Sequence, residues 1–478
     1  MARTHKVRAW LALAVGLVVI AAGCSGGGSR RRPAAPTTTA APATSGGQAA
    51  RGSSGGEARC PLGPVPAPAA DRPSYRLRID LHPERRLVNG DLRVRFTPDL
   101  PTDRLVFRLW PNNPRLRSAG VELRTGPALD RAGRALPSSR PNPTTLQVWP
   151  GGTLAAGEAT EVKLSWKLTL PSRPTGDRIS AQAGTVRLGS FFPLLAWQPG
   201  VGWATDPPAG LGEASTSPTA DFDATVTAPP GLVVLASGSG DGRGHWRAGA
   251  VRDFALSAGH FRLSSGIAHA PNPVKVTVGV DSSLRDQPAD FLRIAVRSLE
   301  NYGKRFAPYP WPTLSMGITP SLLGGIEYPT HIMQGPGTAV GITPHEVGHM
   351  WFYSLVGNDQ AADPWLDEGL ATYAEARFDG VTARYQRFDV PPAVRGRLGE
   401  PMTFWDSHPP GLYFPGVYAQ GAKALLALGG PNVADCVLRV YLTREGYRIA
   451  RPADLVAAAT TVVPDAAPIF ATFGVQTR

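Results

Sequence analysis

The fold and chemistry of this chain are decided by His345-Glu-Val-Gly-His349 and the later Trp365-Leu-Asp-Glu368-Gly. Residues four apart lie on one face of a helix, so the imidazoles of His345 and His349 are expected to point at one place. Neutral imidazoles are good zinc ligands, and a rigid helix holds such a pair ready. Glu368 lies 19 residues beyond His349, far enough for the chain to end one helix, turn and return as a second. The pattern predicts a site for one zinc ion with His345, His349 and Glu368 as ligands.

Turn-forming residues around this stretch predict two helices. Thr343-Pro344 is typical of a helix start, with threonine as the N-cap and proline in the first turn. Gly357-Asn358 predicts the end of this first helix. Asp363-Pro364 predicts the start of the second helix, and Gly380 predicts its end.

Glu346 stands between the two histidines and has two interpretations. A carboxylate at this place is suited to take a proton from a water molecule that a metal activates. The plainer alternative is that Glu346 closes a capping box with Thr343. The presence of Glu368 at a suitable distance favours the metal-site interpretation. The spacing does not decide whether the neighbouring Asp367 supports a ligand.

Length and charge narrow the class of protein. At 478 residues the chain is long enough for two or more domains, and 42% hydrophobic with 8% aromatic residues is typical of globular proteins. The formal net charge is +12, but eight basic residues and only one acidic residue fall within residues 1–59. The rest of the chain has no run of basic residues, so nucleic-acid binding is not expected.

Residues 1–24 resemble a bacterial lipoprotein export signal. A basic start precedes the apolar run Ala9 to Gly23, whose 15 residues are short for a membrane-spanning helix. The run ends at Cys24, which is the predicted lipidation site. The chain is therefore expected to be exported and anchored by lipid to the outer face of the bacterial cell membrane. Plain secretion and an uncleaved anchor are the alternatives.

Residues 25–72 are predicted to form a disordered tether. They are rich in Gly, Ser, Thr, Pro and Ala, and they cannot bury enough apolar surface to offset the entropy lost on ordering. Cys60 and Cys436 are the cysteines that remain besides Cys24, and the sequence leaves open whether they form a disulfide.

Residues 73–267 are predicted to form an antiparallel β-sandwich domain with little helix. Apolar and polar residues alternate over 75–81, 92–96 and 162–170, which is typical of strands with one buried and one solvated face. Shorter strands are expected near 222–228 and 231–236, between Pro and Gly turns.

Residues 268–478 are predicted to form an α+β, mostly helical domain. Strands are expected over 274–280 and 314–318, and an amphipathic helix over 287–306. From Thr343 onward the pattern is mostly helical.

Four motifs in order resemble the aminopeptidase N family of gluzincin zinc metallopeptidases. Two are the His345–His349 motif and the segment around Glu368. Gly324-Gly-Ile-Glu327-Tyr is similar to the family's Gly-Ala-Met-Glu-Asn motif, and Val417-Tyr418-Ala-Gln-Gly-Ala is similar to its Tyr-x-Lys-Gly-Ala segment. The resemblance runs from about Tyr75 to the C-terminus. It implies a saddle-like N-terminal β domain and a thermolysin-like catalytic domain.

The resemblance also implies the catalytic roles. His345, His349 and Glu368 hold zinc, Glu346 is the general base, and Tyr418 stabilises the oxyanion of the tetrahedral intermediate. For Tyr418, an ordinary packing role within its helix is the alternative.

Glu327 and the two glycines before it are the predicted substrate-binding residues. By the resemblance, Glu327 pairs with the free α-ammonium of a peptide, while Gly324 and Gly325 let the peptide backbone approach as an added strand. The implied activity is the release of N-terminal residues from peptides with a free N-terminus. A solvated carboxylate on an edge strand is the alternative for Glu327. For the whole chain, the alternatives are a zinc endopeptidase with the same site and a catalytically silent peptide-binding scaffold.

The chain departs from the family pattern in several places. Gln420 stands where the family usually has lysine, and Gln182 is only a weak substitute for a second amine-binding residue. The chain ends 60 residues after Tyr418, which implies a short lipoprotein form without the family's large C-terminal helical domain. A more open cleft is expected as a result.

Overall fold

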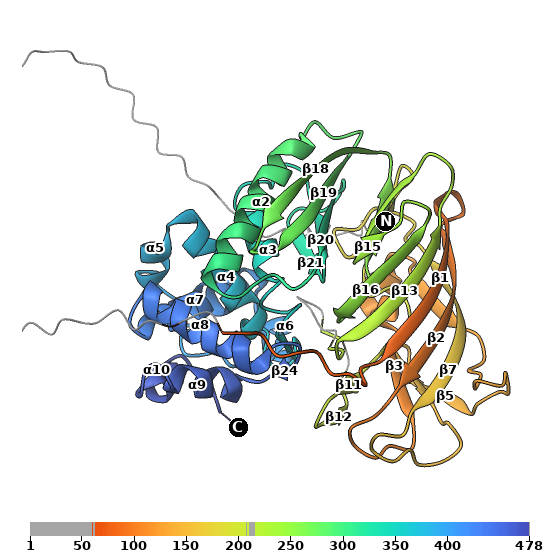
Figure 1. Cartoon of the computed structure of the whole chain (residues 1–478), viewed down its shortest axis with the longest axis horizontal. Helices are drawn as coiled ribbons and strands as arrows, with labels where there is room; N and C mark the ends of the chain where they lie inside the picture. The colour runs from red at the N-terminus through yellow and green to blue at the C-terminus, as the bar shows by residue number, and fades with distance from the viewer. Residues whose placement is uncertain (1–59, 61–62, 207, 210–215, 478) are drawn as a thin grey trace, which may run out of the picture. The chain divides into compact units, whose positions relative to one another are not determined.

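The computed structural model describes residue 60 and residues 63–206, 208–209 and 216–477. The predicted export signal with Cys24, and most of the predicted tether, lie outside the described residues. The described chain is rich in strands in its N-terminal part and mostly helical in its C-terminal part, as Figure 1 shows. This agrees with the expected order of a β-rich part followed by a helical part.

A seven-stranded sheet dominates the N-terminal part. Burial alternates along its strands: β1 buries Tyr75, Leu77 and Ile79 and exposes the residues between them. In sheet order the strands are β15 (Ser239–Gly240), β16 (His245–Val251), β13 (Ala220–Thr227), β1 (Ser74–His82), β2 (Leu87–Phe96), β7 (Thr160–Thr169) and β4 (Glu122–Thr125).

The prediction of a purely antiparallel sheet is wrong at one pair of strands. β13 runs parallel to β1, with Tyr75 opposite Phe222, while β1 and β2 are antiparallel. Parallel neighbours need a long connection. The chain between the end of β7 at Thr169 and the start of β13 at Ala220 is long enough to return in the same direction.

Smaller sheets complete the β-rich part. One contains β10 (Leu194–Leu195), β3 (Leu105–Arg108), β6 (Thr145–Val148) and β5 (Ser138–Asn142). Another contains β14 (Val233–Ala236), β17 (Leu256–Gly259), β9 (Thr185–Leu188) and β8 (Ile179–Gln182), and β11 (Trp197–Gln198) pairs with β12 (Gly202–Trp203). A short helix, α1 (Pro114–Ser118), follows β3. The buried apolar side chains of these sheets join one core with those of the seven-stranded sheet.

A five-stranded sheet precedes the helices. Its order is β18 (Phe261–His269), β19 (Pro273–Asp281), β20 (Thr313–Ile318), β22 (His331–Gln334) and β21 (Gly325–Tyr328). β19, β20 and β22 are parallel, while β18 and β21 are antiparallel edge strands. The boundary predicted after residue 267 falls inside β18. Ser264-Ser265-Gly266 does not interrupt this strand, since all three residues pair in register with β19.

Helices pack against this sheet and one another. α2 (Pro288–Arg305) lies on β18 and β19, and α3 (Ile342–Gly348) contacts α2, α4 (Trp365–Asp379) and β21. The later helices are α5 (Thr382–Gln386), α6 (Met402–Asp406), α7 (Gln420–Ala427), α8 (Pro431–Glu445), α9 (Pro452–Thr460) and α10 (Ala466–Thr472), with the short strands β23 (Gly357–Asn358) and β24 (Ile449–Ala450) paired beside them.

The first metal-site helix differs from the prediction at both ends. α3 begins at Ile342, so Thr343 lies inside it, buried and hydrogen-bonded to Gln334 rather than acting as the N-cap. It ends at Gly348 rather than near Gly357, with His349 as its C-cap. The second predicted helix corresponds to α4, which begins at Trp365, directly after Pro364. It ends at Asp379, and Gly380 follows in the left-handed conformation (φ 72°, ψ 22°), as expected for a helix end.

Cys60 and Cys436 form a disulfide, which the sequence left open. Their Cα atoms are 5.4 Å apart, and the bond joins the start of the described chain to α8. Within the described ranges, no single helix combines the length and apolar character needed to cross a membrane, although Pro410–Ala427 and Pro431–Glu445, bent by 101° at their break, meet that test as a pair.

Candidate metal centre

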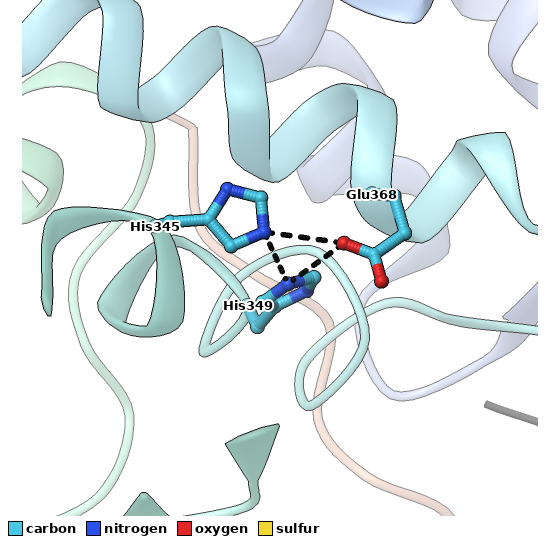
Figure 2. Close-up of side chains that lie close together, drawn as sticks. All are labelled: His345, His349 and Glu368. Carbon is cyan, nitrogen blue, oxygen red and sulfur yellow. Dashed lines mark hydrogen bonds and ion pairs between the residues drawn. The ribbon is translucent and has the colours of Figure 1, made fainter. Parts of the chain in front are cut away.

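His345, His349 and Glu368 converge as predicted. Figure 2 shows the side chains of the two histidines and of Glu368 on α4 pointing toward one another. The Nε2 atoms of the histidines are 3.1 Å apart, and Glu368 Oε2 lies 3.1 Å from His345 Nε2 and 3.4 Å from His349 Nε2. All three side chains are buried. They form a compact set of two nitrogen donors and one oxygen donor.

This set fits one zinc ion. Two ligand atoms on a tetrahedral zinc ion, each about 2.0–2.1 Å from it, are about 3.3 Å apart. Because Nδ1 of each ring faces a carboxylate, the two Nε2 atoms, 3.1 Å apart, can both present lone pairs to a shared cation. Although burial opposes a charged imidazole, the carboxylates of Glu368 and Glu375 raise the pKa of His345 to about 9. The pocket therefore attracts positive charge to the point where the three donor atoms meet.

Polar groups contact the Nδ1 atoms of the two histidines, the ring nitrogens that face away from the donor set. His349 Nδ1 lies 2.6 Å from Asp367 Oδ1, and Gln360 donates to Asp367 Oδ2 at 2.6 Å. His345 Nδ1 lies 3.3 Å from Glu375 Oε2. Neither Glu375 nor Gln360 was predicted from the sequence. Glu375 follows Glu368 by seven residues, or about two turns on the same face of α4, and this spacing is the signal that could have found it.

Glu346 and Glu327 lie beside the metal ligands. One side-chain atom each of Glu327, Glu346 and His349 lies within 4.8 Å of the other two, and all three residues are buried. Glu327 belongs to the edge strand β21, as expected, and its side chain reaches the metal centre instead of solvent. Two carboxylates therefore face the side of the zinc site that β21 borders.

The two predicted substrate-binding glycines, Gly324 and Gly325, differ in the space around their Cα atoms. A Cβ atom added to Gly325 would lie 2.3 Å from Cδ of Glu346, so the missing side chain makes room for Glu346 itself. A Cβ atom added to Gly324 meets nothing within 4 Å. The space beside Gly324 is therefore open, while a side chain at position 325 would displace Glu346.

Tyr418 reaches the metal centre from a π-helix, Phe414–Ala419, a form that is rare and frequent at functional sites. Its hydroxyl donates to Glu368 Oε1 at 2.6 Å, and its ring stacks on that of His345. Burial, with Glu368 beside it, keeps the pKa of Tyr418 well above its ordinary value, so the hydroxyl remains a proton donor at neutral pH. An ordinary packing role does not account for this hydrogen bond to a ligand.

Three further polar residues lie outside the donor set. Gln420 is buried and bonds the backbone of Gly396, Val394 and Gly416. His331 is buried between Ser257 and Ser315. Gln182 ends β8, in the hairpin that leads to β9, and lines a small cavity together with Thr185 and Thr319.

Sequence comparison finds relatives that match this chain over part of its length. The chain is 32% identical over 168 residues to leukotriene A-4 hydrolase of Xenopus laevis, covering 30% of this chain and 28% of that protein. It is 30% identical over 86 residues to aminopeptidase B of Rattus norvegicus, covering 16% of this chain and 13% of that protein. The matches thus span less than a third of these relatives' own length. No family model matches the sequence.

Structure comparison covers most of the chain. A variant of the M1 zinc metallopeptidase from Deinococcus radiodurans matches with a TM-score of 0.63 and 19% identity, over 85% of this chain and 95% of that chain. A two-domain M1 zinc metallopeptidase variant bound to L-arginine also matches with a TM-score of 0.63 and 19% identity, over 85% and 94%. The chain therefore has the fold of an M1 zinc metallopeptidase, with a donor set suited to zinc at its centre.

Proposed function

We propose that this chain is a zinc-dependent aminopeptidase that releases N-terminal residues from peptides. The observation that carries the proposal is the joint position of three groups. A zinc donor set with ligand atoms 3.1–3.4 Å apart lies beside a carboxylate suited to be a general base, and a second carboxylate on the edge strand stands next to both. The names of the relatives, which include aminopeptidase B, support the same activity.

When bound by His345, His349 and Glu368, zinc supplies Lewis-acid chemistry that polarises a carbonyl and makes water more acidic. Glu327 binds the α-ammonium of the peptide. Glu346 accepts a proton from the attacking water and delivers it to the amine that leaves. Tyr418 donates a hydrogen bond to the oxyanion that develops on the carbonyl oxygen. Glu327 limits cleavage to the first peptide bond, because it holds the substrate's terminal charge beside the reacting groups.

The proposal is tested by hydrolysis of aminoacyl p-nitroanilides with the purified protein. The variant Glu346→Gln keeps the shape of the side chain but cannot accept a proton at neutral pH. We expect kcat to fall about 10³-fold or more, while metal analysis still finds zinc bound. Activity retained in this variant would remove Glu346 from the mechanism.

The endopeptidase alternative predicts a different substrate preference. A free α-ammonium is what Glu327 recognises, so acetylation of the N-terminus is expected to abolish cleavage by an aminopeptidase. An endopeptidase cleaves blocked and free peptides alike. The position of Glu327 within the metal centre favours the first outcome. A variant of the Deinococcus radiodurans protein that was solved with a Tyr-Ser-Ala substrate supports short peptides as the substrate class.

The finer fold assignment is part of this proposal. We assign the β-rich part to a saddle-like N-terminal domain and the part with the metal centre to a thermolysin-like catalytic domain. The fold shared with the M1 zinc metallopeptidases supports both assignments.

We also propose that the exported chain is anchored to the membrane through a lipid on Cys24. The support is the sequence alone: a basic start, an apolar run and a cysteine at its end. In a bacterial host, the wild type is expected in the membrane fraction and to carry label from a fatty-acid precursor. The variant Cys24→Ser is expected to lose the label, and label retained by this variant would contradict lipidation at Cys24.

A further inference from the structure

The strand that carries Glu327 is held by its sheet on one side only. The four residues of β21 pair with β22, and no other strand of the described sheet pairs with β21. A short strand at a sheet edge has few backbone hydrogen bonds to fix it. The place of the Glu327 carboxylate beside the metal centre therefore depends on what holds the other side chains of this strand.

Tyr328 follows Glu327 and is held by the β-rich part. Successive side chains of a strand lie on opposite faces, so the ring of Tyr328 points away from the face that Glu327 presents to the metal centre. The ring is buried, and its hydroxyl lies 3.3 Å from Ser190 Oγ. A Cβ atom added to Gly189 would lie 2.2 Å from Tyr328 Cζ. The loop between β9 and β10 therefore contacts the end of this ring directly.

Ser190 and Asp253 complete a chain of buried hydrogen bonds. Ser190 Oγ donates to Asp253 Oδ2 at 2.8 Å, and the backbone N–H of Phe254 donates to Asp253 Oδ1 at 2.7 Å. A serine hydroxyl has a single proton to donate, so Ser190 Oγ is left to accept from the hydroxyl of Tyr328. Tyr328, Ser190 and Asp253 are all buried. An unpaired polar group is costly there, so each member holds the next in place.

The backbone of Ser190 has a conformation that serine seldom adopts. Its φ is 47°, in the left-handed region. Residues other than glycine keep such a conformation only where their surroundings favour it, and they cluster at functional sites. In this conformation Ser190 Oγ lies within hydrogen-bond distance of both Asp253 and Tyr328. The strained residue is thus the one that joins the β-rich part to the edge strand.

We propose that Ser190, oriented by Asp253, positions Glu327 through Tyr328 to recognise the α-ammonium of the peptide. This inference rests on the proposed aminopeptidase function and adds residues of the β-rich part to its recognition of the free amine. Ser190 and Tyr328 act through Glu327 and are therefore positioning residues. Misplacing a recognition group by about 1 Å can cost about 100-fold. Loss of either hydroxyl should therefore weaken the binding of ligands with an α-ammonium and spare ligands without one.

The test compares two zinc-binding ligands that differ only in the α-ammonium, alanine hydroxamate and propanohydroxamate. Isothermal titration calorimetry at neutral pH gives their Kd values for the zinc-loaded protein, and the ratio of the two measures the preference for the amine. We expect the wild type to bind alanine hydroxamate about 100-fold more tightly. In Tyr328→Phe and in Ser190→Ala, which lose only a hydroxyl, this preference is expected to fall to about tenfold. The double variant is expected to fall no further, because both changes remove the same hydrogen bond.

Two further variants set the scale. Tyr309→Phe is the matched control, since Tyr309 is also buried and its hydroxyl donates to Thr313 O at 3.0 Å, at the start of the interior strand β20. This variant loses a comparable hydrogen bond away from β21 and is expected to keep the wild-type preference. Glu327→Gln lacks the carboxylate itself and is expected to bind the two hydroxamates almost equally.

Two outcomes would overturn the inference in different ways. If Glu327→Gln loses the preference but Tyr328→Phe and Ser190→Ala keep it, the two hydroxyls do not position Glu327 and the proposed function stands. An equal loss in Tyr309→Phe leads to the same conclusion. If the wild type binds both hydroxamates equally, Glu327 does not recognise the amine, and the proposed function fails together with the inference. Should Tyr328→Phe not fold, Ser190→Ala decides alone.

Discussion

The two ring nitrogens of His349 face different groups, and Asp367 holds the outer one. Nδ1 lies 2.6 Å from Asp367, whose other oxygen accepts from Gln360. This contact fixes the tautomer that presents Nε2 to a metal. We expect Asp367→Ala to weaken zinc affinity by about 10- to 100-fold, as measured by competition with a chelating dye. Asp379→Ala, at the other end of α4, is the control, and equal affinities of Asp367→Ala and wild type would contradict this role.

His331 makes stability depend on pH. It is fully buried between Ser257 and Ser315, and burial lowers its pKa to about 3. Below its ordinary pKa of about 6.5, the unfolded chain takes up a proton that the folded chain does not. The contribution to stability is therefore present above pH 6.5 and is lost as the pH falls toward 3.

A comparison with His331→Gln isolates this effect. Between pH 6.5 and 4.5, the wild type is expected to lose about 2.3 kcal/mol of unfolding free energy more than the variant. Urea denaturation at both pH values measures the two differences, and the lower absolute stability of the variant cancels from them. The same loss in both proteins would show that His331 takes up its proton in the folded state.

In the segment that begins the edge strand β21, position 325 requires glycine, whereas position 324 has room for a side chain. A side chain at Gly325 would collide with Glu346, whereas one at Gly324 meets open space. Gly325→Ala is therefore expected to lower kcat by at least about 100-fold, because it displaces Glu346, the proposed general base. Gly324→Ala is expected to raise KM modestly and to change kcat much less, since it narrows only the proposed path of the peptide. Steady-state kinetics of the two variants test this, and equal losses of kcat would contradict the separate roles.

The elements that could be predicted are those fixed by local chemistry. Gly380 ends α4 because glycine adopts the left-handed conformation at little energetic cost, and this preference is visible in the sequence. The end of α3 depends instead on distant contacts. Arg252 donates to the carbonyls of Tyr353 and Leu355, so the backbone after His349 leaves the helix to meet a guanidinium from the β-rich part.

The same distinction applies to the candidate site, where local spacing was predictable and contacts between distant elements were not. The spacing of His345, His349 and Glu368 identified the donor set because it follows from helix geometry. The approach of Tyr418 was not predictable in detail, since it requires α4 and α7 to meet closely. A Cβ atom added to Gly421 would lie 2.7 Å from Gly369 Cα, so two glycines far apart in sequence permit this contact. Such pairs become visible only once the helices are placed.

At the scale of the molecule, buried arginines tie the β-rich part to loops of the part that carries the metal centre. Arg252 donates to backbone carbonyls of Ser217, Tyr353, Leu355 and Arg448. Burial lowers its pKa to about 10, which leaves it charged at neutral pH. Arg187 similarly bonds Thr319, in the loop that leads to β21. The loops that flank the zinc site are thus positioned partly by the β-rich part.

The disulfide between Cys60 and Cys436 adds a covalent tie, and its loss should lower the stability of the whole chain. It closes a loop of 376 residues, so its reduction releases a large conformational entropy in the unfolded chain. The double variant Cys60→Ser with Cys436→Ser is expected to be about 2–5 kcal/mol less stable than the oxidised wild type in guanidinium denaturation. Its zinc site should be intact at 25 °C, because the ligands lie on α3 and α4 and not on the tied segment.

Reduction provides the control for this prediction. A reductant should bring the wild type to the denaturation midpoint of the double variant and should leave the midpoint of the variant itself unchanged. The other contacts of the segment around Cys60, such as the hydrogen bond that Arg439 donates to Cys60 O, do not involve sulfur. They are therefore expected to be the same in the reduced wild type and in the double variant. If oxidised wild type and double variant unfold at the same guanidinium concentration, the tie constrains a segment that already stays in place through these contacts.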